Sequence, residues 1–567
     1  MNMKDTPKFK DFKYTRPDMD VLSKTFNDTL NQFSNANNFN EAQKALKEIY
    51  RLRAGFDSMY NLAYIRHSIN TKDAFYETEN SFFDQQLPVF EKLKTDWYKK
   101  LLNSPFKARL SKEYGQQLFD IAHLSLKTFS PEIIEDLQEE NRLSTAYNKL
   151  KATAQIDFDG KTYNLSSIVP QEQDKDRAVR SAASKAKWDW LAAQQEELDR
   201  IFDELVKTRH RIAQKLGFEN FVELGYARML RTDYDAKQVK YYRDQIRQYF
   251  VPLATKLYKK QQERLGLDSL KYYDESLIFP NGNPQPQGDP EWIVQQANQM
   301  YTELSKDTAD FFRFMQDKEL MDLNSRDGKA TGGYCTFMTD FKAPFIFSNF
   351  NGTSGDIDVL THEAGHAFQI YNSRDLEIGE YYWPTYEACE IHSMSMEFFT
   401  WPWMELFFKE QVEDYHFAHL CGSVYFLPYG VAVDEFQHYV YENPEDSPAQ
   451  RNQAWKAIEH KYLPQRNYNG HAYLESGAFW QKQSHIFSMP FYYIDYTLAQ
   501  ICAFQFWIRD RKNHEEAWND YVRLCKVGGS QSFLSLVEVA GLNSPFKSGT
   551  VEELSVAVGA YLLDEIG

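Results

Sequence analysis

Glycine and proline are scarce in this chain of 567 residues, at 25 and 20 residues or about 8% together, against roughly 12% in average proteins. Because glycine and proline interrupt helices and form turns, their scarcity favours long helices over architectures with many tight turns. The chain also lacks the run of about 18 apolar residues that a membrane-spanning helix needs, so we expect no membrane association.

The chain has fewer basic than acidic residues, with 64 Lys and Arg against 81 Asp and Glu, and its net charge is −17. Because such a surface repels phosphate, nucleic acid is not expected as a partner.

Cysteine is rare as well, and its spacing contains no Cys-x-x-Cys pair. The five residues are odd in number and scattered along the chain: Cys335, Cys389, Cys421, Cys502 and Cys525. This usage favours reduced thiols, and the polar N-terminus has no apolar stretch typical of a secretory signal. We therefore expect a cytoplasmic protein. Its 43% hydrophobic and 16% aromatic residues suffice for a large core, which excludes a disordered chain and a small disulfide-stapled fold.

Most of the sequence has the apolar period of amphipathic helices, so the expected fold class is mainly α. Between Arg200 and Gly217 apolar residues recur at helical spacing, and Gly217 provides a stop signal. Ser130-Pro131 predicts a helix start, with a capping hydroxyl before a proline at the first helical position. We expect an N-terminal helical region over residues 1–180 and a longer catalytic region over 181–567.

Two segments depart from the helical pattern. Residues 156–165 alternate apolar and polar side chains around Asp159-Gly160, which predicts a β-hairpin. Residues 332–350 predict two short strands, and Pro344 suggests that the later one is an edge strand, since proline cannot donate to a ladder. The Pro- and Gly-rich stretch between Phe279 and Pro290 predicts a loop.

The clearest chemical pattern follows these strands, in Thr361-His362-Glu363-Ala364-Gly365-His366. On a helix, positions i and i+4 share a face, so His362 and His366 can present two imidazole nitrogens to one metal ion. Glu363 lies beside them, where it can reach a water at the metal without being a ligand. The alternative is an ordinary helix with two histidines. Its apolar neighbours predict a buried helix, in which two imidazoles and a carboxylate are costly without a metal.

The third ligand decides the type of site. Gln369 and Asn372 stand where a histidine-only site would need Gly and His, so a carboxylate is expected. The downstream candidates are Glu377, Glu380, Glu387 and Glu390. Glu390 is favoured because it lies in an apolar segment 24 residues after His366, which leaves room for a loop and an antiparallel helix. Three protein ligands leave a position for water, as in catalytic rather than structural sites.

Two carboxylates are candidates for supporting this site, and one histidine competes for it. Glu397 lies seven positions after Glu390 on the same helical face, and Asp358 lies one turn before His362. Either could accept a hydrogen bond from a ligating imidazole. For each of them the alternative is a solvated helix residue. His392 is a competing but less favoured ligand.

The order of motifs resembles the thimet oligopeptidase and oligoendopeptidase F family of zinc peptidases, closest to its oligoendopeptidase F and Pz-peptidase branch. The motifs are Gly332-Gly333-Tyr334-Cys335, Pro344-Phe345-Ile346, Asn349-Phe350-Asn351-Gly352-Thr353, the His-Glu-x-x-His helix and Glu390-x-x-Ser393-x-x-x-Glu397. The resemblance covers the chain from about Arg180 almost to its end. The first 180 residues match only in helical character.

The resemblance implies one zinc ion per chain, bound by His362, His366 and Glu390, with Glu363 as general base. It also implies an elongated, nearly all-α body whose deep channel admits oligopeptides and excludes folded proteins. The strand from Phe345 to Phe350 would pair with the substrate backbone. The family further uses a downstream histidine and tyrosines to stabilise the oxyanion, and the candidates here are His485, Tyr496, Tyr492 and Tyr493. For each tyrosine, a packing role is the alternative.

The expected function is therefore hydrolysis of internal bonds of short oligopeptides by metal-activated water. A zinc exopeptidase is one alternative, although no group that recognises a chain terminus is evident. A non-catalytic peptide-binding scaffold is another, although such a protein would not need Glu363. Two imidazoles and a carboxylate suit zinc, with cobalt and manganese left open. The chain is expected to act as a monomer or a small homo-oligomer.

Overall fold

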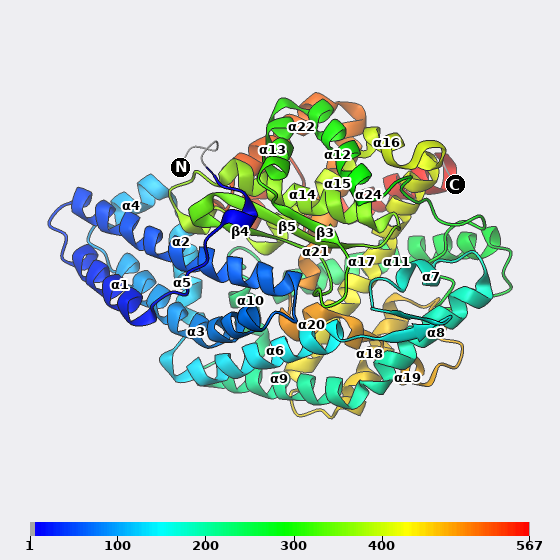
Figure 1. Cartoon of the computed structure of the whole chain (residues 1–567), viewed down its shortest axis with the longest axis horizontal. Coiled ribbons are helices and arrows are strands. Elements are labelled where there is room, and N and C mark those ends of the chain that lie inside the picture. The colour runs from blue at the N-terminus through cyan, green and yellow to red at the C-terminus, as the bar shows by residue number, and fades with distance from the viewer. Residues whose placement is uncertain (1–5, 566–567) are drawn as a thin grey trace.

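Helices make up most of the protein, whose computed structural model describes residues 6–565 (Figure 1). This confirms the mainly α fold class expected from the sequence. Five short strands form two small sheets, one with the order β1-β2 and one with the order β3-β5-β4. Within residues 6–565, none of the helices combines the length and apolar character required to cross a bilayer.

The first five helices project from one end of the molecule, on the left of Figure 1. They are α1 (Met19–Ser34), α2 (Phe39–Ile69), α3 (Ala74–Leu102), α4 (Lys107–Tyr114) and α5 (Gln117–Thr128). Side chains cap three of them, since Asp18, Asn38 and Asp73 accept hydrogen bonds from backbone N–H groups of the first turn. Their buried residues mostly form a core of their own, which Ile378 and Tyr381 join.

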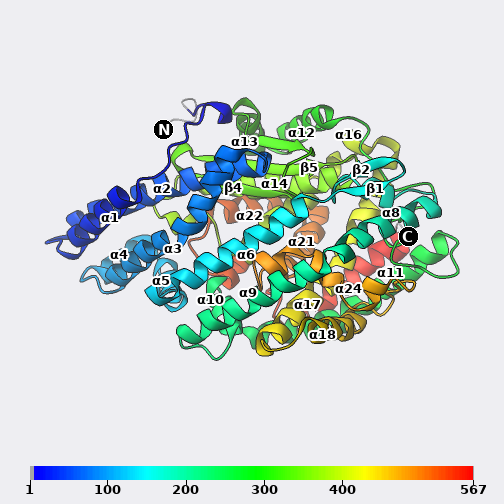
Figure 2. The same ribbon diagram turned by 60° about the horizontal axis from the view of Figure 1, so that its bottom comes forward.

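Most helices of a second group run along the lower part of Figure 1 and come forward in Figure 2. It contains α6 (Ile134–Ala152), α7 (Val169–Glu172), α8 (Arg177–Ala193), α9 (Gln195–Lys215), α17 (Val412–Glu442), α18 (Pro448–Tyr462) and α19 (Ala472–Glu475). The predicted helix after Arg200 is α9, and Gly217 follows it at φ +84°. Ser130 accepts from Glu132 N in the turn that precedes α6, as a helix start requires.

The predicted hairpin is present as β1 (Ile156–Phe158) and β2 (Lys161–Tyr163), an antiparallel pair. Asp159 and Gly160 have φ values of +49° and +73°. Positive φ at both central residues is the geometry of a type I′ turn, which explains why Asp-Gly marks this hairpin.

The second sheet corrects one expectation. It consists of β3 (Met321–Asn324), β4 (Tyr334–Met338) and β5 (Ala343–Phe350), and β5 is the central strand. The segment from Phe345 to Phe350 therefore belongs to the central strand and not to an edge, with β4 paired along residues 343–347 and β3 along residues 346–350. Pro344 is tolerated because it lies at the start of β5, while pairing with β3 begins only at Ile346. Within this sheet the edge strands are β3 and β4.

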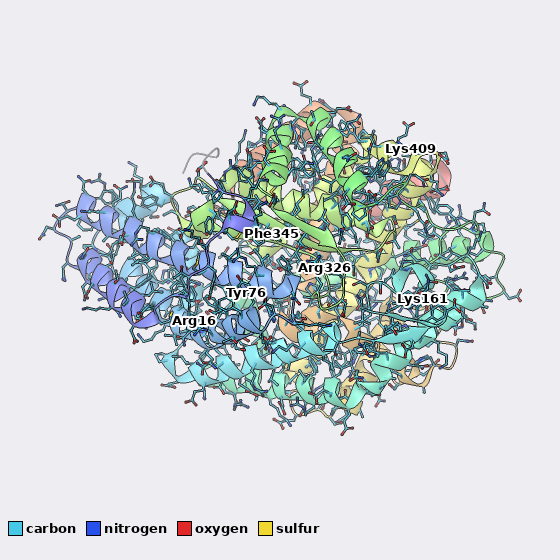
Figure 3. The ribbon with its side chains drawn as sticks, viewed as in Figure 1. Arg16, Tyr76, Lys161, Arg326, Phe345 and Lys409 are labelled. Carbon is cyan, nitrogen blue, oxygen red and sulfur yellow. The ribbon has the colours of Figure 1, made fainter. Side chains whose placement is uncertain are left out.

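The remaining helices form the upper and central parts of the molecule. They are α10 (Phe221–Arg228), α11 (Ala236–Arg264), α12 (Pro290–Leu304), α13 (Lys306–Asp317), α14 (Gly355–Ser373), α15 (Tyr386–Phe399), α16 (Glu405–Phe408), α20 (Ser484–Ser488), α21 (Tyr493–Lys512), α22 (His514–Val527), α23 (Phe533–Val539) and α24 (Thr550–Ala560). At the centre, α15 packs between α14 and α21, and α14 also packs on the β3-β5-β4 sheet. Phe345 marks this sheet in Figure 3. These three helices and the sheet position the candidate site.

Candidate active site

A tight turn sets the start of α14, the helix that carries the His-Glu-x-x-His sequence. The Asp356 carboxylate accepts hydrogen bonds from the backbone N–H groups of Asn351 and Gly352, both at 2.8 Å. Gly352 has a φ of +88°, which favours glycine at this position. The turn therefore joins β5 directly to α14 and fixes the helix against the sheet.

Glycine inside the motif brings α15 close to α14. A Cβ atom on Gly365 would lie 2.6 Å from the carbonyl oxygen of His392 and 2.6 Å from the Cα atom of Ser393. Real Cβ atoms essentially never show contacts this short, so any side chain at this position would force the helices apart. Only glycine therefore permits the helix separation that places Glu390 beside the two imidazoles.

Three side chains converge at this contact, as the sequence predicted. The Nε2 atoms of His362 and His366 lie 3.1 and 3.3 Å from Oε2 of Glu390. One ligand atom from each residue lies within 4.8 Å of the other two. Tetrahedral zinc with bonds of about 2.0–2.1 Å separates two ligand atoms by about 3.3 Å, so the spacing fits such an ion.

The hydrogen bonds around these residues require a cation between them. His362 donates from Nδ1 to Oε1 of Glu397 at 2.7 Å. The neutral His362 ring then has a lone pair on Nε2, which points at the carboxylate of Glu390. Two acceptors at 3.1 Å repel one another, so a cation lies between them, either a metal ion or the Nε2 proton of a charged ring. Burial lowers the pKa of His362, but Glu390 and Glu397 outweigh burial and raise this pKa well above its usual value. The donor set therefore fits a divalent metal, and the bond to Glu397 fixes the tautomer that a ligand needs.

The carboxylate of Glu390 is itself oriented by two donors. Ser393 Oγ donates to Oε2 at 2.8 Å, and the Tyr492 hydroxyl donates to Oε1. Burial favours a raised pKa for Glu390, but His366 and His362 outweigh burial and hold the pKa well below its usual value. The group is therefore ionised, as a metal ligand must be.

Glu397 also contacts another histidine, which was not predicted from the sequence. His419, on α17, contacts the other oxygen of Glu397 through Nε2 at 2.8 Å, while its Nδ1 accepts from Trp401 Nε1 at 3.2 Å. Glu397 thus joins a candidate ligand to a buried histidine from a distant helix. Nothing in the sequence marks His419, because it lies 22 residues after Glu397 and belongs to no motif.

The other carboxylate proposed to support the site has a different partner. Asp358 accepts a hydrogen bond from the Tyr415 hydroxyl at 2.7 Å rather than from a ligating imidazole. It lines the same cavity as Glu397, a space of about 270 Å³ whose other walls are Gly333, Val359, His362 and Glu363. Asp358 therefore borders the site without orienting a ligand directly.

The competing ligands lie elsewhere. The His392 ring is buried, and its Nδ1 bonds the carbonyl oxygen of Ala388 at 2.7 Å. Glu377 pairs with Lys47, and Glu380 pairs with Arg53, both outside this cavity. Glu387 lies one turn before Glu390, with no hydrogen-bond partner for either carboxylate oxygen among residues 6–565. None of them joins the His362, His366 and Glu390 group.

Glu363 lies at the wall of the cavity, where the sequence placed a base. Its Oε2 atom is buried and has no hydrogen-bond partner within the described chain. Burial raises the pKa of this carboxyl, and the nearby His362 and His366 offset that rise only in part. A carboxylate of raised pKa is suited to accept and return a proton near neutral pH.

His485 and Tyr496 face this centre from a different part of the chain. Tyr429 donates to Oε1 of Gln483 at 3.0 Å, so the Gln483 amide nitrogen faces Nδ1 of His485 and donates to it at 2.8 Å. The proton of the neutral His485 ring is then on Nε2, which donates to the Tyr496 hydroxyl at 3.2 Å. The Tyr496 hydroxyl also interacts with the neighbouring hydroxyl of Tyr492.

Tyr492 and Tyr493 have distinct surroundings although they are adjacent. Tyr492 bonds Glu390, whereas the Tyr493 ring packs edge-on against Phe426 at 5.6 Å and makes no hydrogen bond that the structure records. The preceding residue, Phe491, has a φ of +69°, and its backbone is held by Gln437 and Arg231. This strained residue directs Tyr492 toward Glu390.

The chain is similar to known proteins over nearly its whole length. The Peptidase M3 N-terminal domain matches residues 9–129, and Peptidase family M3 matches residues 171–278 and 295–556. The solved structure of Pz peptidase A with an inhibitor is 55% identical, covers 99% of this chain and 100% of its own, and has a TM-score of 0.98. A protein from Bacillus anthracis str. Ames, assigned as an oligoendopeptidase F, is 55% identical, covers 99% of each chain and has a TM-score of 0.93. No curated protein sequence matched.

A more distant structure, a peptidase from Chlamydophila abortus, shares 16% identity at a TM-score of 0.67, which shows the fold alone. The family profile covers more than half of the chain, and close structural relatives span nearly all of it. The resemblance stated from the sequence motifs is thus confirmed. The chain belongs to peptidase family M3 and is a metalloendopeptidase that hydrolyses oligopeptides.

Proposed function

We propose that one zinc ion per chain is held by His362, His366 and Glu390. The observation that carries this proposal is the approach of two imidazole nitrogens to one carboxylate oxygen, at 3.1 and 3.3 Å, with the Nδ1 proton of His362 already committed to Glu397. A bound zinc ion supplies Lewis acidity, which polarises the scissile carbonyl and lowers the pKa of the attacking water.

The side chains around that centre divide the proton transfers between them. Glu363 takes a proton from the attacking water and returns it to the departing amine, a role supported by its raised pKa and its unpartnered buried oxygen. Tyr496 donates its hydroxyl proton as a hydrogen bond to the oxygen of the tetrahedral intermediate, and His485 orients that hydroxyl. Such a donor typically contributes about 2.7–4 kcal/mol.

Substrate binding follows from the sheet as well as from the metal centre. Within residues 6–565, no strand pairs with the side of β4 away from β5, so an extended peptide can add there. Next to β4, Gly333 lies so close to Glu363 that an added Cβ would be 3.4 Å from its Oε1. A peptide on β4 therefore passes beside the proposed base. We propose short oligopeptides as substrates, cleaved at internal bonds.

Replacement of the base tests the mechanism. Glu363→Gln should retain zinc, because all three ligands remain, but should lose nearly all turnover, because the amide cannot accept the proton. Zinc content and kcat on an oligopeptide are the two measurements. A variant that cleaves at close to the wild-type rate would remove Glu363 from this role.

An end-blocked peptide separates the proposed activity from an exopeptidase. A ten-residue peptide that is acetylated at its N-terminus and amidated at its C-terminus should be cut at internal bonds. Cleavage should stop when a chelator removes the metal, and a folded protein should not be cut. Mass spectrometry of the products reads out the cut positions. Release of only terminal residues, from unblocked peptides alone, would favour the exopeptidase alternative. Binding without any cleavage by the zinc-loaded enzyme would favour the non-catalytic scaffold.

We also propose a division of the chain near residue 180, into an N-terminal helical region and a catalytic region. The separate core of α1–α5 and the separate match of residues 9–129 support a division, without placing its boundary. Limited proteolysis is the direct test, and a preferred cut far from residue 180 would move the boundary.

A cytoplasmic location and a monomeric or small oligomeric state are proposals of the same kind. The five cysteines are free thiols, four of them buried, which suits a reducing compartment. Cell fractionation and light scattering would test the two proposals.

A further inference from the structure

Two lysines lie beside the His485 side of the active site. Lys482 ends a short helical turn three residues before His485, and Lys151 lies near the end of α6. The Lys151 ammonium donates to the backbone carbonyl of Lys482 at 2.9 Å, which brings the two side chains into one region although 331 residues separate them. Both residues are partly buried.

Neither ammonium group has a carboxylate partner within the described chain. Lys482 Nζ lies over the rings of Phe479, at 4.0 Å, and Tyr429, at 5.2 Å. Cation–π contacts of this kind compensate only part of the cost of removing an ammonium from water. Burial, with Lys187 nearby, lowers the pKa of Lys482 to about 7, and burial lowers the pKa of Lys151 to about 8.

The neighbouring cations differ because they are already neutralised. Lys187 pairs with Glu172 at 2.7 Å, and Arg466 pairs with Glu275 at 3.1 Å. Glu172 and Glu275 act on Lys482 from a distance, but each of them is paired with another cation, so no carboxylate among the described residues contacts either ammonium group. An anionic ligand is favoured where such charges are partly desolvated.

This positive pair adjoins the reacting groups. Tyr429, whose ring lies beneath Lys482, also donates through Gln483 to His485, the residue that orients Tyr496. Burial lowers the pKa of His485 to about 4, and the charge of Lys151 acts in the same direction. A peptide held at the metal centre and extended past His485 would reach the ammonium groups.

We propose that Lys482, assisted by Lys151, binds a carboxylate of the peptide substrate beyond the His485–Tyr496 pair. Carboxylates are the anionic groups of an unmodified peptide, and they come either from the C-terminus or from Asp and Glu side chains. This inference rests on the proposed peptidase function and adds a preference to it. The enzyme should favour peptides that carry a carboxylate at a fixed distance from the scissile bond.

Three peptides of one sequence test the preference in the wild-type zinc enzyme. The first has a free C-terminal carboxylate, the second a C-terminal amide, and the third an amide with Glu near that end. A charged hydrogen bond of ordinary strength predicts that kcat/KM for the first or third exceeds that for the second by about tenfold or more. Preference for the first assigns the site to the C-terminus, and preference for the third assigns it to an acidic side chain.

Variants then assign the preference to the lysines. Lys482→Met, or Lys151→Met if the former does not fold, should lower the ratio of kcat/KM between the charged and the neutral peptide toward one. Lys161→Met is the matched control, since Lys161 is exposed on the β1–β2 hairpin, in the right half of Figure 3, and its replacement should leave the ratio unchanged.

Two outcomes would overturn the inference. One is equal kcat/KM for all three peptides in the wild-type enzyme, and the other is a preference that survives replacement of both lysines. If the peptide with the C-terminal amide is still cleaved, either outcome contradicts only the carboxylate preference and leaves the proposed peptidase function intact. Failure to cut any of the three peptides with zinc bound would instead count against both the proposed function and this inference.

Discussion

Gly365→Ala is the change whose effect can be worked out most directly from the structure. The added Cβ would lie 2.6 Å from two backbone atoms of α15, whereas ordinary van der Waals contact begins at 3.4 Å. The two helices must therefore separate by about 0.8 Å, several times the ±0.2 Å tolerance of a metal site. Overpacking of this kind costs about 1–3 kcal/mol. If that strain falls on the ligand geometry, zinc affinity drops by roughly tenfold to a hundredfold.

Competition with a chelator measures the zinc affinity, and circular dichroism checks that the variant is folded. Gly422→Ala is the matched control, because Gly422 lies in the interior of α17 and an added Cβ there meets nothing within 4 Å. The control should bind zinc normally and gain about 0.5–1 kcal/mol from helix propensity. A Gly365→Ala enzyme with wild-type zinc affinity and activity would refute the argument that this glycine sets the position of Glu390.

Other predictions concern turnover and acid stability. Tyr496→Phe should lower kcat by about 100- to 1,000-fold with little change in KM, because it removes a hydrogen-bond donor to the oxyanion. The control, Tyr493→Phe, should change kcat less than threefold. Equal effects of the two substitutions on kcat would show that Tyr496 has only a packing role. Burial alone would raise the pKa of Glu140, but Arg228 and Arg209 outweigh burial and hold this pKa at about 2. In the unfolded chain the pKa is about 4.5, so ionised Glu140 stabilises the fold above that pH. This stabilisation is lost as the pH falls toward 2. Glu140→Gln should therefore lower the free energy of unfolding by about 3 kcal/mol at pH 7, and this loss should be smaller by roughly 1.4 kcal/mol at pH 3.5. A difference in melting temperature between the variant and the wild type that is the same at both pH values would contradict this assignment.

Local patterns predicted much of the secondary structure. The helix after Arg200 and the Asp159-Gly160 hairpin both match, because helical period and turn residues act over a few neighbouring positions. The third strand of the larger sheet, β3, was not predicted. Its four residues, Met321–Asn324, are too short to show a period.

The pairing of that sheet could not be read from the sequence either. Pro344 indicated an edge strand, but a proline at the start of a central strand breaks no hydrogen bond when the neighbouring strand pairs further along. Which strand is central depends on the arrival of β3 from another part of the chain. That is a property of tertiary packing and not of the proline.

The sequence by itself determined that His362, Glu363 and His366 share one helical region, since one turn of an α-helix fixes their spacing. It also favoured Glu390 over three other carboxylates, from its apolar setting and its place in the family motif. Only the tertiary structure decided that Glu397 joins His362 to His419, that Asp358 faces Tyr415, and that two lysines without carboxylate partners lie beside His485. These contacts join segments far apart in the chain, and they form because the packing of buried helices, rather than any local pattern, determines which side chains meet.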